Sequence, residues 1–278
     1  MDHIGVPLSW KVPLKHSLHS LQTSIWVAIA HLLQYILYGT GFFLLPIAQI
    51  SIFIRSSLLS PTYEFIPSPP KLPAKLSTDL DAHNPANIPD LEILPVPINL
   101  NPAQTFTTRE GIFSLLCILV RPKSTGSVRL ASADPQVRPI VDLGTLASPE
   151  DVTVLRKGVH FTQALACHIF ASGWAPMTSH EIPASPSDMD VDTYIRSMAQ
   201  TEYHYSSTCR MAPEEEGGVV DDELKVHGVK DLRVADASIF PTIMATHTQA
   251  PTVAVAEKCA DMVRNEWRHR ATLRMIQW

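Results

Sequence analysis

Side chains that can move a proton gather in the last quarter of this 278-residue chain. His204 lies in one polar and aromatic block, and His247 follows 43 residues later in another. Histidine titrates near neutrality, so a neutral imidazole can accept a proton and a protonated one can stabilise an alkoxide. The chain holds 12 histidines, and an isolated histidine is more often an ordinary polar residue of the core. The surrounding sequence must therefore decide between these two interpretations.

Composition excludes several other kinds of site. The four cysteines lie far apart and form no CxxC pair, so neither a disulfide framework nor a metal site is indicated. The 22 basic and 27 acidic residues give a net charge of −5, and the basic ones are scattered, which disfavours nucleic acid as a partner. With 45% apolar and 18% charged residues, the chain is too hydrophobic for a disordered protein and somewhat undercharged for a soluble one. We expect a folded protein, with membrane contact as an open alternative.

Residues 16–54 contain no Asp, Glu, Lys or Arg. A helix that spans a bilayer needs about 20 apolar residues. Here Gly39-Thr40-Gly41 and Pro46 interrupt the run, and several His and Gln side chains would lie in hydrocarbon. The favoured interpretation is a buried core helix over about 23–38, a glycine turn and a second apolar segment that lines a pocket. Membrane contact through residues 25–54 stays open.

The middle of the chain changes from loops to predicted sheet. Ten prolines in residues 60–105 break any long helix and predict loops with short extended pieces. Within them, residues 91–96 have strand-like apolar content and predict an ordered sheet edge. The apolar run at 111–120 predicts a buried strand, and a turn after it leads to an adjacent strand near 128–130.

Three helices and a short strand are expected further along. Ser148-Pro149 supplies an N-cap and a first-turn proline for a helix that runs to about Phe170. A second amphipathic helix begins near Asp190 and ends close to Tyr203-His204. Residues 232–235 predict a short strand, and Pro251 opens a C-terminal helix.

The blocks of the last quarter form an ordered set. They are EYHYSSTCRM (202–211), GGVVD (217–221), LRVADASIFPT (232–242) and HTQAPT (247–252). This set resembles the C-terminal signature of the glucose-methanol-choline (GMC) oxidoreductases, a family that oxidises alcohols with FAD. Looser matches at 121–135, 149–158, Asp2-His3 and Gly39-Thr40-Gly41 extend the resemblance over nearly the whole chain.

The resemblance implies an α+β fold. Residues 1–200, with Pro-rich loops at 60–105, would form the substrate-binding lobe, an antiparallel sheet with flanking helices. Residues 201–278 would form the C-terminal part of the FAD-binding domain, with a strand and a helix. The dipole of that helix would favour the anion formed when flavin is reduced.

The resemblance also implies roles for individual residues. His204 would be the catalytic base, and His247 a second histidine that faces the same spot. Tyr205, beside the base, would shape the pocket. The remaining expected cofactor contacts are Asp236, Ala237, Thr248 and Gln249. Ser207 and Ala212 stand where the family usually has glycine, so either an altered close approach of the backbone or a strained turn is expected there.

No G-x-G-x-x-G motif occurs in the sequence, so the family's N-terminal dinucleotide-binding half is not expected in this chain. The start, Met1-Asp2-His3-Ile4-Gly5, lacks a secretory signal and resembles the middle of a domain. These features indicate a fragment, a truncated gene model or one half of a split enzyme, with a separate chain supplying the rest of the FAD site.

The predicted function is FAD-dependent oxidation of an alcohol by hydride transfer to flavin, as a dehydrogenase or an oxidase. The apolar residues 25–54 indicate a hydrophobic small molecule as substrate, such as a secondary-metabolite intermediate. Two alternatives stay open: a truncated, non-catalytic remnant that binds a hydrophobic ligand, and a membrane-associated protein. A cytoplasmic and a membrane-associated location are both compatible with the sequence.

Overall fold

The computed structural model describes residues 1–60, 87–101 and 110–276. The chain forms two compact units. One, here called the sheet unit, comprises Ile4–Leu119 and Ser148–Gln200; the other, the tail unit, comprises Met1–His3, Val120–Ala147 and Thr201–Trp278. Most of the predicted Pro-rich loops lie outside the described residues. The division into a substrate-binding lobe and an FAD-binding part stays a prediction.

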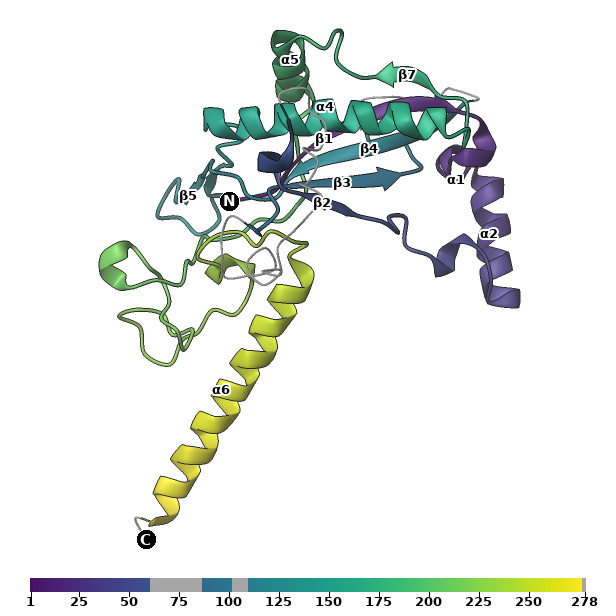
Figure 1. Ribbon diagram of the computed structural model, residues 1–278. Coiled ribbons are helices and arrows are strands. Elements are labelled where there is room, and N and C mark those ends of the chain that lie inside the picture. The colour runs from purple at the N-terminus through teal and green to yellow at the C-terminus, as the bar shows by residue number, and fades with distance from the viewer. Residues whose placement is uncertain (61–86, 102–109, 277–278) are drawn as a thin grey trace, which may run out of the picture. The chain divides into compact units, whose positions relative to one another are not determined.

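An antiparallel sheet forms the centre of the sheet unit (Figure 1). Its strands lie in the order β2 (Ile52–Ile54), β3 (Leu91–Val96), β4 (Gly111–Leu119), β1 (Ile4–Val12) and β7 (Thr178–Glu181), and the short β8 (Gln200–Thr201) also pairs with β1. The antiparallel sheet and the strands at 91–96 and 111–120 are confirmed. β3 is not an edge strand, however, because β2 pairs along its outer side.

The central strands β1 and β4 pair along their whole length, with Ile4 opposite Leu119 at one end and Val12 opposite Gly111 at the other. Every residue of β4 is buried, which explains its continuous apolar run in place of alternation. Ser9 and Ser114 lie opposite each other, and their hydroxyls are hydrogen-bonded at 2.9 Å. The buried polar pair is thereby satisfied.

Helix α4 (Pro149–Ala171) packs on β4 and β3. The Ser148 side chain accepts a hydrogen bond from the backbone N–H of Glu150, as its N-cap position predicts. The predicted buried stripe is confirmed, and its members are Val152, Leu155, Val159, Thr162 and Ala166.

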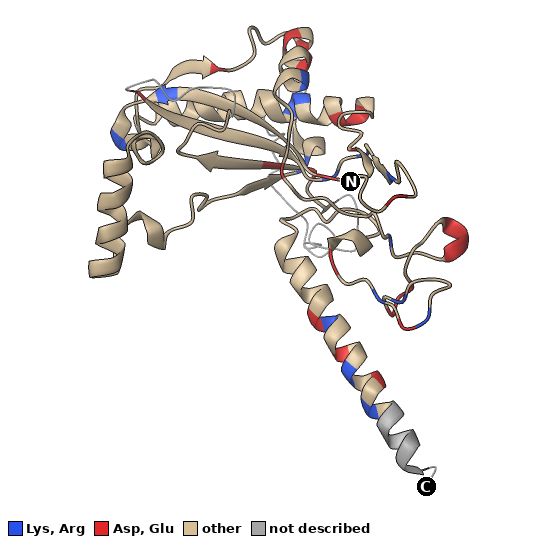
Figure 2. Cartoon of the chain, turned by 180° about the vertical axis from the view of Figure 1, so that it is seen from behind, with Lys and Arg blue, Asp and Glu red and all other residues tan. Residues whose placement is uncertain are grey.

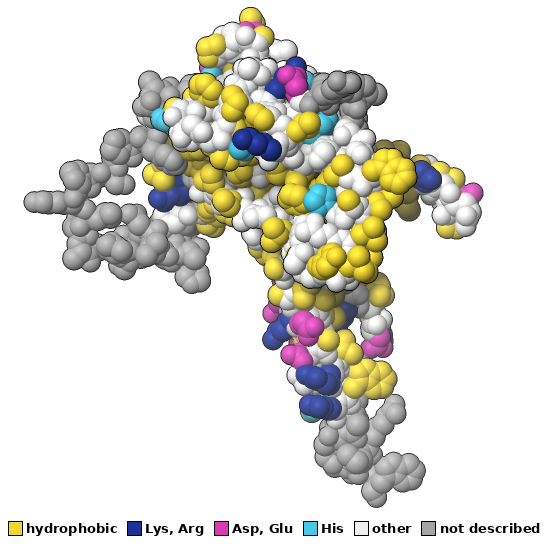
Figure 3. All heavy atoms as spheres, turned by 90° about the vertical axis from the view of Figure 1, so that its right-hand side faces the viewer, with side chains coloured by type: hydrophobic (Ala, Val, Ile, Leu, Met, Phe, Trp, Pro, Cys, Tyr) yellow, Lys and Arg dark blue, Asp and Glu magenta, His cyan; other side chains and the backbone are white. Residues whose placement is uncertain are grey.

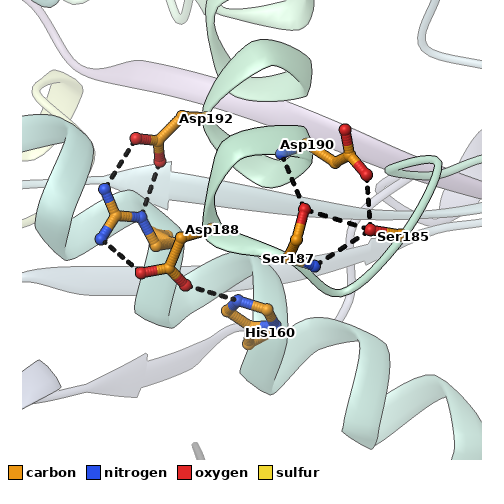
Figure 4. A network of polar contacts seen from close by, with 7 residues as sticks. His160, Ser185, Ser187, Asp188, Asp190 and Asp192 are labelled. Carbon is orange, nitrogen blue, oxygen red and sulfur yellow. Dashed lines mark hydrogen bonds and ion pairs between the residues drawn. The ribbon is translucent and has the colours of Figure 1, made fainter.

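Arg156 of α4 joins this helix to α5 (Asp188–Met198) through Asp188 and Asp192, two carboxylates that Figure 4 labels. Its Nε and Nη2 each donate to the Asp192 carboxylate at 2.7 Å, and its Nη1 donates to Asp188 at 3.0 Å. The predicted end of this helix near residue 204 is wrong. Ala199, with φ −58° and ψ 126°, leaves the helical conformation, and the next two residues pair with β1 as β8.

A second helical region precedes β2. It contains η1 (Leu14–His16), α1 (His19–Thr23), α2 (Ile25–Tyr38) and η2 (Phe42–Leu44), and η3 (Ser56–Leu58) follows β2. Gly39 ends α2 in the left-handed conformation, with φ 60°, which confirms the predicted glycine turn.

The prediction that α2 is a buried core helix is wrong, because none of its residues is buried in the structure. The side chains of Trp26 and Leu37 are 76% and 66% exposed, and hydrophobic side chains spread over this face of the molecule (Figure 3). Its packing neighbours α1 and η2 have five and three residues and cannot cover a helix of 14. Within the described ranges, no helix is both long and apolar enough to cross a membrane.

The tail unit contains a two-stranded sheet of β5 (Ser127–Arg129) and β6 (Ile140–Asp142). The predicted strand near 128–130 forms, but it pairs with β6 and not with β4. The predicted strand at 232–235 is wrong, since this segment forms an isolated bridge between Arg233 and Lys225. Positive φ angles at Leu224, Gly228 and Asp231 turn the chain repeatedly here and prevent a longer ladder.

Two short turns, η5 (Glu214–Glu216) and η6 (Ala237–Ile239), precede the long α6 (Gln249–Ile276). The core of the tail unit consists of Val220, Leu224, Ile239 and Phe240. Partly buried side chains from the first half of α6 pack against it, among them Val255, Cys259 and Met262. Charged side chains of both signs begin only after the first two turns of α6 (Figure 2). The core therefore anchors the side of the first half of α6 that carries Val255, Cys259 and Met262.

Candidate active site

Two of the sequence blocks run side by side in the tail unit. The backbone N–H groups of Ser207, Cys209 and Met211 donate to the carbonyls of residues 237, 238 and 239, at 3.3, 2.9 and 2.8 Å. Ile239 and the following Phe240 are buried in the tail-unit core. The segment that carries His204 is therefore fixed to the most buried part of this unit.

The first residues of the chain hold the other side of this segment. One Asp2 carboxylate oxygen accepts the backbone N–H of His204 at 2.9 Å, and the other accepts the Thr201 hydroxyl. The Ser206 N–H donates to the Met1 carbonyl at 3.0 Å. The backbone on both sides of His204 is thus bonded to residues about 200 positions away in the sequence.

Three imidazoles meet at this place. Nδ1 of His3 lies 2.9 Å from Nδ1 of His204, with the ring planes at 89°. The ring centroids of His204 and His247 are 5.4 Å apart, with the planes at 68°. His204 is half-buried and His247 is exposed, whereas His3 is only 1% exposed. The structure therefore brings together the two histidines that the sequence singled out and adds a third.

His3 is neutral at neutral pH. Burial, and secondarily the neighbouring His204 ring, lowers the pKa of His3 to about 4. Hydrogen bonding to the backbone, chiefly at the Met244 carbonyl and also at Val120, raises the pKa and opposes this shift without overcoming it. A group that stays neutral here can accept or donate one hydrogen bond at each nitrogen without adding charge.

The other predicted site residues lie around this cluster in the chain. Asp236 is exposed and caps η6, where its carboxylate accepts the Ser238 N–H at 2.7 Å. Ala237 is half-buried, and its carbonyl accepts from Ser207. Tyr205 is half-exposed, and its ring lies edge-on to that of Tyr203.

Thr248 and Gln249 follow His247 directly and lie where α6 begins. Thr248 is buried, and its carbonyl accepts both the N–H and the hydroxyl of Thr252, at 3.0 and 2.7 Å. Gln249 is exposed. The start of α6 is thereby fixed next to the second histidine.

The two positions where the family usually has glycine behave differently. Ser207 has a φ of 70°, in the left-handed region that L side chains rarely adopt, so the expected strained turn is present. At Ala212 the backbone is closely approached by the backbone of Gly218: a Cβ atom added to Gly218 would lie 1.9 Å from the Ala212 carbonyl oxygen. Glycine is therefore needed at 218.

Sequence reasoning gave no role to His3. Its main partners, His204 and Met244, lie 201 and 241 positions away. The available signal was the resemblance of Asp2-His3 to a family segment, together with the position of His3 directly before an almost fully buried strand.

Comparison with protein families supports the resemblance. The model described as GMC oxidoreductase matches residues 122–256. The chain is 38% identical to the alcohol dehydrogenase [acceptor] of Pseudomonas putida over 151 residues, and this aligned region is 53% of this chain and 26% of that protein. It is 33% identical to the human mitochondrial choline dehydrogenase over 183 residues, and this aligned region is 64% of this chain and 30% of that protein.

Solved structures show the same similarity. A formate oxidase from Aspergillus oryzae superposes with a TM-score of 0.78 and 26% identity over 97% of this chain and 47% of that one. A fungal aryl-alcohol oxidase gives a TM-score of 0.69 and 25% identity over 96% of this chain and 48% of that one. The chain thus spans about half the length of these structures and less than a third of the two curated relatives.

Proposed function

We propose that this chain, whose residues 122–256 match the GMC oxidoreductase model, carries the substrate-side residues of an FAD-dependent enzyme that oxidises an alcohol. The observation that supports this most directly is the contact between the rings of His204 and His247 within one compact unit. The relatives named as alcohol and choline dehydrogenases and the oxidases among the solved structures are consistent with either a dehydrogenase or an oxidase.

In the proposed reaction, an alcohol loses a proton from its hydroxyl and a hydride from its carbon, and it leaves as the carbonyl compound. FAD, when bound, supplies the acceptor for the hydride. His204 takes the hydroxyl proton, because a neutral imidazole accepts a proton near neutral pH. His247 lies beside it, where a hydrogen bond from its ring would stabilise the developing alkoxide.

The residues of this chain fit the flavin end of FAD better than the ADP end. The first N–H groups of α6 have no carbonyl four residues before them in the helix, and they form a partially positive end next to His247. Thr248, Gln249, Asp236, Ala237 and Tyr205 are proposed to contact the flavin side of the cofactor. The sequence has no G-x-G-x-x-G motif, so we propose that the ADP side is held by residues outside this sequence, in a longer form or a separate chain.

We propose a hydrophobic alcohol, such as a secondary-metabolite intermediate, as the substrate. The support is the uncharged span of residues 16–54, which adds exposed apolar surface to the sheet unit. A bound apolar substrate would remove part of this surface from water.

The test begins with the native polypeptide that contains this sequence. Its mass and flavin content show whether a longer form or a partner accompanies FAD. In the flavin-containing protein, His204→Ala should lower kcat for alcohols by on the order of 10²–10⁴-fold while the flavin content stays unchanged. His227→Ala is the matched control, because His227 is another half-buried histidine of the tail unit, bonded to the Ala212 carbonyl at 3.0 Å. Equal losses in both variants, or a protein that binds apolar ligands but never flavin, would favour the non-catalytic remnant.

A second candidate function is association with a membrane surface. The observation that favours it is that α2 and η2 expose apolar side chains and carry no charge. Large exposed apolar patches mark interaction sites in soluble proteins. This function does not exclude the first.

A further inference from the structure

We propose that His3 is a positioning residue that keeps the proton of neutral His204 on Nδ1, so that Nε2 of His204 is the atom that accepts the substrate's proton. The proposal rests on the proposed function for the role of Nε2. The assignment of the proton itself rests on the hydrogen bonds of the tail unit alone.

The first step fixes the proton of His3. Its Nε2 lies 3.0 Å from the carbonyl oxygen of Met244. A carbonyl oxygen accepts hydrogen bonds and cannot donate one, so Nε2 of His3 carries hydrogen. The ring is 1% exposed, so a second proton would place an unpaired charge in the interior. His3 is therefore the neutral Nε2–H tautomer, and its Nδ1 carries a lone pair.

The second step uses this assignment to place the proton of His204. The two Nδ1 atoms are 2.9 Å apart, which is a normal length for a hydrogen bond between nitrogens. Because Nδ1 of His3 has only a lone pair, the hydrogen between them must belong to Nδ1 of His204. In neutral His204, Nε2 then carries the lone pair.

The third step concerns catalysis. A general base needs its lone pair on the atom that faces the substrate, and an imidazole in the other tautomer cannot accept a proton there. In serine-protease triads a carboxylate holds the histidine tautomer. Here the acceptor is a neutral imidazole, which orients the base without adding a buried negative charge. After His204 has accepted a proton at Nε2, its Nδ1–H still donates to His3, so the ring need not rotate during the reaction.

Asp2 strengthens this arrangement. Its carboxylate accepts the backbone N–H of His204 at 2.9 Å, while the adjacent His3 accepts from the ring. Two consecutive residues thus hold the main chain and the side chain of the same histidine. Such a double attachment limits both the position and the rotation of the ring.

The proposal predicts a tautomer that can be measured without activity. In the full chain labelled with ¹⁵N-histidine, two-bond ¹H–¹⁵N correlation spectra at pH 7.5 should show His204 as a single Nδ1–H tautomer, with its signals assigned by their loss in His204→Gln. The His3→Leu variant removes the acceptor and should give a mixture of tautomers. The His3→Asn variant places an amide oxygen near the former Nδ1 and should restore the Nδ1–H form. An Nε2–H tautomer in the unmodified protein, or no change in His3→Leu, overturns the proposal.

Activity in the flavin-containing protein gives the second readout. His3→Leu should lower kcat by on the order of 10²-fold with little change in KM, and His3→Asn should recover most of it. If His3→Leu does not fold, the tautomer of His204 in the unmodified protein and in the His3→Asn variant still tests the proposal. If His204 is the Nδ1–H tautomer but His204→Ala keeps full activity, the proposed function is wrong and the hydrogen-bond assignment stands. If His204→Ala loses activity but His204 is the Nε2–H tautomer, the proposed function stands and the hydrogen-bond assignment is wrong.

Discussion

A Cβ atom added to Gly158 of α4 would lie 2.5 Å from Sγ of Cys117 in β4 and 2.9 Å from a Leu91 methyl group in β3. The helix therefore approaches the sheet as closely as the absence of a side chain allows. Cys117 is fully buried there, and this burial raises the pKa of its thiol to about 12, so it serves as a small apolar residue.

Gly158→Ala should therefore destabilise the protein by about 1–3 kcal/mol, because the methyl group overpacks the contact. Helix propensity alone predicts the opposite sign, a gain of about 1 kcal/mol, which makes the result decisive. Urea unfolding of the variant measures the difference. Thr153→Ala, at an exposed position of the same helix, should stay within about 0.5 kcal/mol of the parent. A Gly158→Ala variant that is more stable than the parent would refute the close contact.

Local sequence was sufficient for α4 and β4. Ser148 caps α4 through its own side chain, and the apolar run of β4 needs no partner to be recognised. β1 was not predicted, because Pro7 and Lys11 interrupt its apolar pattern and its burial depends on β4 and β7. The exposure of α2 could not be predicted either, since periodicity describes a face and not what covers it.

The candidate site shows the same limit. His204 and His247 were found because the residues around them resemble a family motif, and the structure places their rings in contact. Their catalytic roles stay predictions. His3 carries little local signal, because its importance comes from a hydrogen bond to a residue 201 positions away. Contacts of this kind depend on tertiary structure, which one sequence does not specify residue by residue.

Ser207 offers a test of backbone strain. Its φ of 70° costs an L residue about 1–2 kcal/mol, whereas glycine adopts it freely but loses more entropy on folding. Ser207→Gly should therefore stabilise the protein by about 0.5–1 kcal/mol in thermal or urea unfolding. Thr208→Gly, at the next residue, whose φ is not positive, should destabilise it. A loss of stability in Ser207→Gly would show that the hydroxyl contributes more than the turn costs.

The buried His3 should make stability fall in mild acid. Its pKa is about 4 in the folded state and about 6.5 in the unfolded chain, so between these values the unfolded state binds more protons. Stability therefore rises with pH across this window, and acidification from pH 6.5 to 4 should remove about 3 kcal/mol. His160, whose pKa is also lowered by burial, contributes in the same direction.

The comparison with His3→Asn isolates the His3 contribution, because the variant lacks the titrating ring and keeps His160. Urea unfolding at pH 7, 5.5 and 4 should give a shallower pH dependence for His3→Asn than for the parent. Identical slopes would mean that His3 is solvated or already protonated in the folded protein. That result would also contradict the neutral state from which the tautomer of His204 is inferred.

The exposed face of α2 makes a prediction about lipid. Ile36 and Leu37 are 64% and 66% exposed, and no charged residue lies between positions 16 and 54. If this face enters a membrane surface, burial of each side chain contributes about 1.5–3 kcal/mol. The double variant Ile36→Lys/Leu37→Lys should then sediment with phosphatidylcholine vesicles at least about tenfold more weakly. Because the span has no basic residues, anionic lipid should add little to the binding.

Leu130→Lys, at an 84% exposed position of the tail unit, is the control and should bind like the parent. Unchanged binding of the double variant, or binding that requires anionic lipid, would exclude α2 as the contact.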